Sequence, residues 1–199
     1  QLAALPQYRA EFARAFPGDP DPVSLANAQK AIAVFEATLI TPNAPFDRFL
    51  RGDAAALDAD QKAGLTLFMD KGCTACHSGI NLGGSMYAQF GAVAPPDVKY
   101  RPVTDKGRSA VTGKAADDYF FKVPTLRNIA LTAPYFHTGS ERDLAKVVNV
   151  MATTQLGQTL TPAENAQIVA FLNSLTGEKP RIVVPQLPPS DANSPLPAK

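Results

Sequence analysis

The run Cys-Thr-Ala-Cys-His at residues 73–77 constrains this chain more than any other feature, because it contains both cysteines and one of only two histidines. Two thiols three positions apart on one helical turn can add to the two vinyl groups of a single haem and form thioethers. The next residue, His77, is then held under the iron, where an imidazole nitrogen can ligate it. The run therefore predicts haem c, attached at Cys73 and Cys76 with His77 as an axial ligand.

Three other interpretations of this run explain the residues less well. A structural zinc site takes four Cys or His ligands, and only His137 is left after these three. A thioredoxin-like redox pair expects a βαβ context, which the sequence does not show. A plain disulfide would not explain the adjacent histidine. Haem is attached to such motifs outside the bacterial cytoplasm or on the equivalent face of an organelle membrane, so the periplasm is the expected compartment.

Composition limits the classes of partner. With 199 residues the chain can form one large or two small domains. Its 19 basic and 18 acidic side chains are nearly balanced, which gives no general footprint for nucleic acid. No stretch is long and apolar enough to span a bilayer, and no signal peptide is visible. Because Gln1 is not an initiator methionine, we expect a processed product or a fragment.

Periodicity and capping residues predict an all-α fold in which 18 prolines separate short helices by long, stiff loops. Helices are expected over residues 6–16 and from Ser24 to about Leu39. The second helix carries an apolar stripe that we expect to be ordinary core. The stripe consists of Leu25, Ala28, Ile32, Phe35 and Leu39.

Two further helices are expected to cross beside the haem. Asp58 and Gln61 form a capping box that opens the helix leading to the attachment run. Gly64 and Phe68 share one face of it, so another helix can approach closely. The expected partner spans residues 161–175 and opens with its own capping box. Its buried face is predicted to contain Ile168, Phe171, Leu172 and Leu175. Two such helices resemble the cytochrome c fold.

The segments around these helices are expected to be irregular. Regular structure is hard to place between Ser78 and Lys122, and a loop of that length is expected to be functional or to pack on a cofactor. After Gly177 the chain is rich in proline, so this tail is expected to be extended on another surface or disordered.

The second axial ligand has several candidates. Met69 lies four residues before Cys73, on the same side as the thioethers, and is expected to be core. Met86 follows His77 by only nine residues and is expected to have a packing or solvent-facing role. Met151 is 151 − 77 = 74 residues beyond His77, enough chain to reach the opposite face.

Met151 and His137 remain the two main alternatives for that position. Ser140 and Asp143 are expected to cap a helix that ends near Met151, where a thioether can point at a metal. His137 would instead give a bis-histidine haem, or could be hydrogen-bonded near a propionate. Methionine ligation raises the reduction potential relative to histidine. A His77/Met151 haem would accept an electron readily and would be too closed to activate peroxide.

The chain strongly resembles the bacterial di-haem cytochrome c peroxidases. The resemblance spans nearly the whole chain, and it is carried by residues 37–42, 47–52, 72–84, 124–128, 131–139 and 151–157. It implies that the haem at residues 73–77 is the high-potential, electron-accepting one, with Met151 at the position of its sixth ligand. Related di-haem enzymes that mature a quinone cofactor have a tyrosine there, so the peroxidase branch is favoured.

Further site residues follow from the same resemblance. It implies that the backbone carbonyls of Thr132 and Pro134 help to hold a calcium ion between two haem domains, and carbonyl oxygens suit calcium. Arg127 is a candidate partner of a haem propionate, because a guanidinium suits a carboxylate, with a surface role as the alternative. A small soluble cytochrome c or cupredoxin is the implied electron donor, and a homodimer is the implied assembly.

The departure from the family is large, because the second Cys-x-x-Cys-His motif and the tryptophan between the haems are absent. We therefore expect residues 1–40 to be helices from the end of the peroxidatic domain. Residues 41–178 would be a class I cytochrome c-like domain, and residues 179–199 a tail packing on the neighbouring domain. Hydrogen peroxide would be reduced at a second haem in that other domain.

The leading hypothesis is thus the electron-entry half of a periplasmic di-haem peroxidase. The alternatives are a stand-alone mono-haem electron carrier and a haem-based gas sensor in which Met151 is displaced. Peroxide turnover coupled to oxidation of a reduced cytochrome separates the peroxidase from the carrier, and ready binding of carbon monoxide would favour the sensor.

Overall fold

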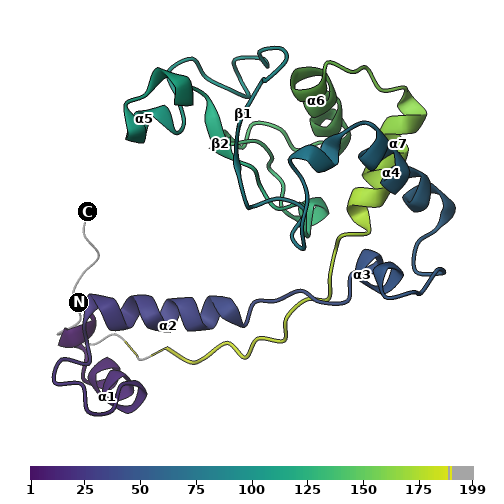
Figure 1. Cartoon of the computed structure of the whole chain (residues 1–199). Coiled ribbons are helices and arrows are strands. Elements are labelled where there is room, and N and C mark those ends of the chain that lie inside the picture. Colours follow the sequence, from purple (N-terminus) through teal and green to yellow (C-terminus); the bar gives the residue numbers. More distant parts are fainter. Residues whose placement is uncertain (188, 190–199) are drawn as a thin grey trace. The chain divides into compact units, whose positions relative to one another are not determined.

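The structure, a computed structural model, describes residues 1–187 and 189 (Figure 1). The chain divides into two compact units. The first contains residues 1–40 together with the chain from Lys179 onward, and the second spans Thr41–Glu178. The assignment of these segments to two different haem domains stays a prediction.

The first unit is built from a short 3₁₀ helix η1 (Leu2–Ala4) and two α-helices, α1 (Pro6–Ala15) and α2 (Leu25–Ala37). As predicted, the Ser24 side chain caps α2 by accepting a hydrogen bond from the amide of Asn27 (3.3 Å). The Asn27 side chain donates in turn to Asp19 Oδ2 (2.8 Å) and to the carbonyl of Pro22 (3.0 Å), which fixes the turn before α2.

The apolar stripe of α2 is exposed, so the prediction that it forms ordinary core is wrong for this chain. Leu25 is 76% exposed, Ile32 58% and Phe35 50%. The cause is the lack of a second layer, because an apolar helix face is buried only when another element packs on it. Among the described residues of this unit, Asn27 alone is buried.

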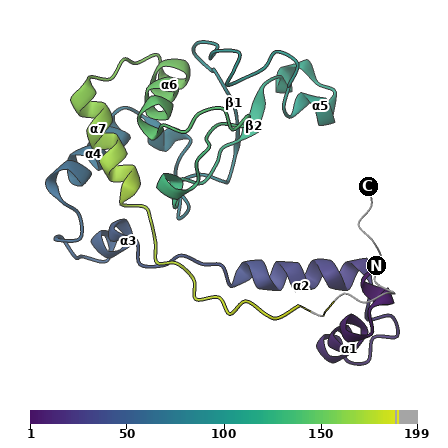
Figure 2. The same cartoon turned by 180° about the vertical axis from the view of Figure 1, so that it is seen from behind.

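The second unit holds the remaining elements, in this order: α3 (Pro45–Leu50), α4 (Ala59–Asp70), η2 (Cys73–Ala75), β1 (Tyr87–Gln89), α5 (Ser109–Thr112), η3 (Ala115–Asp117), β2 (Phe120–Lys122), η4 (Ile129–Leu131), α6 (Leu144–Leu156) and α7 (Pro162–Asn173). Figure 2 shows the same elements from behind. The all-α prediction is confirmed, with one small addition described below.

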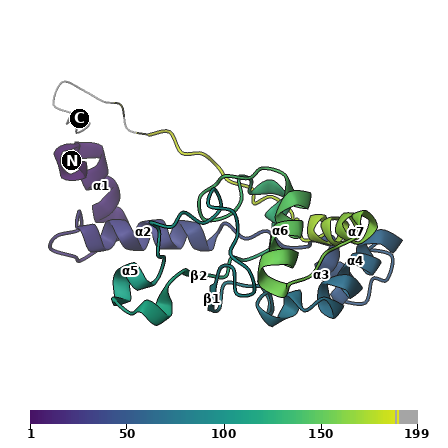
Figure 3. The same cartoon turned by 90° about the horizontal axis from the view of Figure 1, so that it is seen from above.

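Helices α4 and α7 cross closely, as predicted, and lie side by side in all three views (Figure 3). The crossing point is Gly64, where an added Cβ would lie 1.8 Å from the carbonyl oxygen of Gln167. Both helices begin with complete capping boxes, Asp58 with Gln61 and Thr161 with Glu164. The core around the crossing consists of Phe46, Leu57, Phe68, Leu82, Leu126, Ile168, Phe171, Leu172 and Leu175.

The long segment between Ser78 and Lys122 contains a two-stranded antiparallel ribbon that the sequence did not predict. Strands β1 and β2 pair with Tyr87 opposite Lys122 and Gln89 opposite Phe120. Three-residue strands are too short to show an alternating pattern, which explains the omission. In the tail, residues 179–187 form neither helix nor strand, and residues 190–199 lie outside the described residues.

Helix α6 extends further than expected. Asp143 alone caps it, accepting from the amides of Ala145 (2.9 Å) and Lys146 (3.3 Å). The helix continues to Leu156 and is ended by Gly157 at φ 65°. The expectation of an end near Met151 is wrong, because the hydroxyl of Thr154 bonds back to the helix carbonyl of residue 150 (2.7 Å) and does not interrupt the helix.

Candidate haem-attachment site

The attachment run forms a single tight turn directly after α4. Gly72 leaves the helix at φ 91°, a conformation that glycine adopts at little cost. The amides of Cys76 and His77 then both donate to the carbonyl of Cys73, at 3.3 Å and 2.9 Å. Both cysteines are free and partly buried, and burial raises the pKa of the Cys73 thiol. Two thiols on one turn, followed by an imidazole, is the arrangement that the sequence predicted.

The start of α7 anchors this turn. The ammonium group of Lys71, the residue that ends α4, lies 2.7 Å from Glu164 Oε1. The side-chain amide of Gln158 donates to the Lys71 carbonyl (3.0 Å). Contact with Lys71, together with the backbone amide of Thr161, lowers the pKa of Glu164 to about 2. Lys71, just before the attachment turn, is therefore held through both its side chain and its backbone carbonyl.

The imidazole of His77 is partly buried and is oriented by a backbone carbonyl. Burial lowers the pKa of His77, although its contacts with backbone carbonyls partly oppose this. Its Nδ1 lies 3.2 Å from the carbonyl oxygen of Leu82. A neutral ring that donates through Nδ1 presents Nε2 to a metal, and such a contact to the other nitrogen is usual for histidine ligands.

Gly83 makes room for that ring. It has φ 128°, and an added Cβ would lie 2.2 Å from the Pro124 carbonyl oxygen and 3.2 Å from His77 Nδ1. Any other residue at this position would displace the carbonyl or the imidazole. At this position the loop therefore approaches the histidine through its backbone.

A cavity of about 480 Å³ opens beside the turn. His77 and Thr74 line one side of it, and Phe46, Phe68 and Phe171 contribute apolar surface. A volume of this order and an apolar lining are typical of cofactor sites. His77 and Thr74, which lie on the same turn as the two thiols, line the cavity, and its apolar surface fits a haem attached at Cys73 and Cys76.

The candidates for the second axial ligand, three methionines and His137, lie in different surroundings. Met69 is 49% exposed and lines the cavity, so its prediction as core is wrong. Met86 is also exposed, just before β1. Met151 is half-buried near the middle of α6, and its role as sixth ligand stays a prediction. His137 Nε2 lies 2.9 Å from Asp105 Oδ2, so this nitrogen already contacts a carboxylate.

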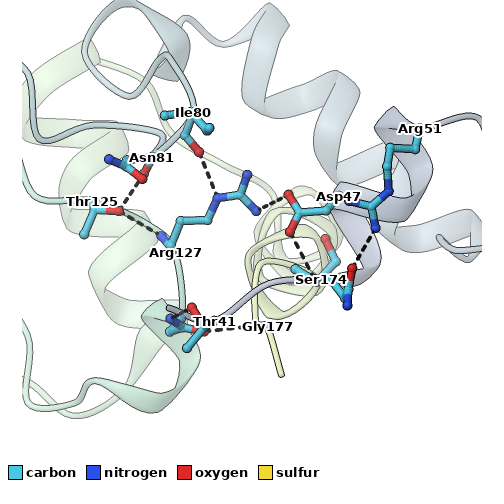
Figure 4. A network of polar contacts seen from close by, with 12 residues as sticks. Thr41, Asp47, Arg51, Ile80, Asn81, Thr125, Arg127, Ser174 and Gly177 are labelled. Carbon is cyan, nitrogen blue, oxygen red and sulfur yellow. Dashed lines mark hydrogen bonds and ion pairs between the residues drawn. The ribbon is translucent and has the colours of Figure 1, made fainter. Parts of the chain in front are cut away.

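Arg127 lies at the same cavity, paired with a residue that the sequence analysis did not single out. Its Nη1 is 2.6 Å from Asp47 Oδ1, and its Nε donates to the carbonyl of Ile80 (3.0 Å; Figure 4). Asp47 is the third residue of α3, and its other oxygen accepts from the amide of Ala44 (3.0 Å). A carboxylate at the third position of a helix is a local signal for a cap, whereas the ion pair with Arg127 has no local signal. The propionate role of Arg127 stays a prediction.

The residues whose carbonyls are predicted to bind calcium are exposed. Thr132 and Pro134 both lie on the surface. Within residues 1–187 and 189, no group donates a hydrogen bond to either carbonyl oxygen. The same residues contain no group of three or more His, Cys, Asp and Glu side chains arranged to hold a metal. A site here would therefore depend on backbone oxygen.

Comparison with known proteins places the chain in a family. Residues 1–55 match the model described as di-haem cytochrome c peroxidase, and residues 61–176 match the cytochrome c model. The cytochrome c551 peroxidase of Pseudomonas aeruginosa is 51% identical over 198 residues, which cover 100% of this chain and 57% of that protein. The cytochrome c551 peroxidase of Nitrosomonas europaea is 44% identical, with 98% and 57% covered.

A solved structure is also similar. A MauG-like protein associated with microbial copper homeostasis superposes with a TM-score of 0.74 at 28% identity, over 89% of this chain and 60% of that one. No helix in the described residues is long and apolar enough to cross a membrane. The chain spans little more than half the length of these relatives. The chain belongs to the cytochrome c family and, through its first 55 residues and its relatives, to the di-haem cytochrome c peroxidases.

Proposed function

We propose that this chain is the electron-accepting haem c portion of a periplasmic di-haem cytochrome c peroxidase. One observation carries the proposal: two free thiols and an imidazole whose Nδ1 faces a backbone carbonyl lie on a single turn beside an apolar cavity. The relatives named cytochrome c551 peroxidase support the activity. In the longer protein, a second haem in another domain would reduce hydrogen peroxide to water.

Each residue of the site has a defined task in this proposal. Cys73 and Cys76 attach the cofactor, and His77 ligates it through Nε2 while the carbonyl of Leu82 holds Nδ1. Haem bound in this way supplies one-electron transfer. Met151, on the rigid helix α6, is the proposed second axial ligand and would raise the reduction potential. The apolar side chains of the cavity exclude water from the site.

The proposal extends to the parts around the haem. A small soluble cytochrome c or cupredoxin would deliver the electrons, and the longer protein would form a homodimer. Arg127 would reach a haem propionate with the part of its guanidinium that Asp47 and Ile80 do not engage. Thr132 and Pro134, which are exposed, would offer their carbonyl oxygens to calcium.

Calcium binding is tested by calorimetric titration of the haem-loaded protein. Heat of binding with calcium but not with magnesium is expected, since flexible carbonyl ligands suit the larger ion. Equal heats, or none, with both ions would remove calcium from the proposal.

Attachment is tested by intact-mass measurement after expression in a host that can mature c-type cytochromes. The protein is expected to carry one covalent haem, and the double variant Cys73→Ala/Cys76→Ala should carry none. Recovery of only the bare polypeptide would refute the proposal.

The ligand and the activity require two further measurements. The ferric protein should show a weak sulfur-to-iron band in the near infrared that disappears in Met151→Ala but persists in Met86→Ala. A bis-imidazole spectrum would move the ligand assignment to His137. The reduced electron donor should be oxidised by peroxide only when the remaining domain of the longer protein is present. If the longer protein exchanged electrons rapidly with the donor but did not turn over peroxide, a mono-haem carrier would be favoured.

A further inference from the structure

Three successive carbonyls next to the attachment turn, those of residues 80–82, are each bound by a side chain. The first accepts from Arg127 Nε (3.0 Å), and the second accepts from the Thr125 hydroxyl (2.6 Å) (Figure 4). The third faces His77 Nδ1 at 3.2 Å. The carbonyl that orients the imidazole thus belongs to a short segment whose preceding carbonyls are fixed from outside.

Arg127 itself is firmly placed. Its ion pair with Asp47 is short (2.6 Å), and both side chains are less than one-fifth exposed. The guanidinium carbon lies 5.7 Å from the centre of the Phe46 ring. Asp47 is held in turn by the amide of Ala44 (3.0 Å). A continuous series of contacts therefore runs from helix α3 through the ion pair to the carbonyl of residue 80.

The segment needs such support because its backbone is unusual. Leu82 is a non-glycine residue at φ 47°, and its side chain is buried. Residues in this region persist only where the surroundings hold them. Gly83 follows at φ 128° and leaves no side chain to fix the position of the imidazole. On the amino-terminal side of Leu82, the side chains of Arg127 and Thr125 add to two backbone hydrogen bonds, from the amide of Leu126 to the carbonyl of residue 81 (3.3 Å) and from the amide of Leu82 to the carbonyl of residue 79 (3.0 Å).

We propose that Asp47 and Arg127 are positioning residues for the histidine ligand. By fixing the carbonyl of residue 80 they hold the carbonyl of residue 82 against His77 Nδ1. That contact makes the imidazole a stronger donor, and a stronger donor favours the oxidised iron. The ion pair therefore keeps the reduction potential lower than it would be with a loose segment. This inference rests on the proposed ligation by His77.

The main test is the double variant Asp47→Asn/Arg127→Gln, measured in the haem-loaded protein. It removes the ion pair without changing the net charge, and the carboxamide introduced on α3 would keep an oxygen for the amide of Ala44. The midpoint potential should rise, by an amount of order tenfold in the reduction equilibrium, or about 59 mV for one electron. The hyperfine-shifted proton resonances of the His77 ring should move in the same variant.

Arg51 provides a matched control. It lines the same cavity, but its side chain donates to Asn43 Oδ1 (3.0 Å) and not to residues 80–82. Arg51→Gln removes a positive charge, so its potential should fall slightly or stay the same, with the His77 resonances unmoved. A rise like that of the double variant would show a general effect of the cavity and would overturn the inference.

A second variant decides the matter if the double variant does not fold. Arg127→Lys keeps the charge and the contact with Asp47 but loses the planar fork that also reaches the carbonyl of residue 80. Its potential should rise by about a third of the double variant's shift or more. If this variant carried covalent haem but its potential and its His77 resonances were unchanged, the inference would be overturned while the proposed function would stand. Absence of covalent haem from the unsubstituted protein would instead refute the proposed function.

Discussion

Helices α2 and α7 are almost the same length and both carry apolar stripes, yet one stripe is exposed and the other is buried. In α7, Ile168, Phe171 and Leu172 are buried against α4. In α2, the equivalent side chains face outward. The difference lies in the partner, because α4 offers a glycine at the crossing point and nothing comparable covers α2 among the described residues. An apolar stripe thus indicates that a helix needs a partner, but not whether the chain provides it.

The largest expected effect comes from the buried stripe. Phe171→Ala should lower the free energy of unfolding by about 3–5 kcal/mol, because Phe171 is fully buried and contacts Phe46 and Phe68. Urea denaturation, followed through both midpoint and slope, measures the change. A loss of below about 1 kcal/mol would show that the core around the crossing can collapse into the space.

Gly64, at the crossing point, tests whether a change to alanine stabilises or destabilises the fold. In an exposed helix, Gly→Ala is stabilising by about 1 kcal/mol through helix propensity. At Gly64 the new Cβ would meet the Gln167 carbonyl at 1.8 Å, so we expect a destabilisation of about 1–3 kcal/mol instead. The same denaturation experiment measures it. Stabilisation by Gly64→Ala would contradict the close crossing of α4 and α7.

The ion pair between Lys71 and Glu164 should make the stability of the unit that contains α7 depend on pH. The pKa of Glu164 is lowered from 4.5 to about 2 in the folded chain, so its ionised form stabilises the fold above pH 4.5. This contribution should be lost as the pH falls from about 4.5 to about 2. Thermal unfolding of Glu164→Gln against the unsubstituted protein should show a gap that closes over this range. A gap that is constant with pH would exclude the ion pair as its cause.

The smallest expected effect lies on α2. Phe35→Ser should change the stability of this chain by less than about 0.5 kcal/mol, because the side chain is already half exposed. In a protein of the relatives' full length we expect the additional domain to cover this face, and the same substitution should then cost several kcal/mol. If Phe35→Ser changed the stability of this chain and of the full-length protein by the same small amount, α2 would stay uncovered in both.

The parts that the sequence predicted well depend on local chemistry. The capping boxes at Asp58 and Thr161 and the attachment turn involve residues within four positions of one another. The close crossing at Gly64 was also predictable, because a small residue one helical turn from an aromatic is a local pattern.

The parts that were missed depend on tertiary contacts or on weak local preferences. Asp47 and Arg127 are 127 − 47 = 80 residues apart, so their ion pair has no local sequence pattern. The end of α6 was misjudged because Thr153 and Thr154 suggest a break, whereas their hydroxyls bond to the preceding turn. The exposure of the α2 stripe depends on a partner that the described chain does not supply.

The crossing of α4 and α7 also has a consequence for the order of events during synthesis. It joins the first long helix of the second unit to its last, so α4 gains its partner only when nearly the whole unit has been made. Contacts between such distant segments form late, because the intervening chain must first close into a loop. Until then the cysteines that follow α4 belong to a chain that has not completed its fold. We therefore expect a maturation enzyme outside the cytoplasm to find both thiols accessible on the exported polypeptide, before the last helix encloses the cavity.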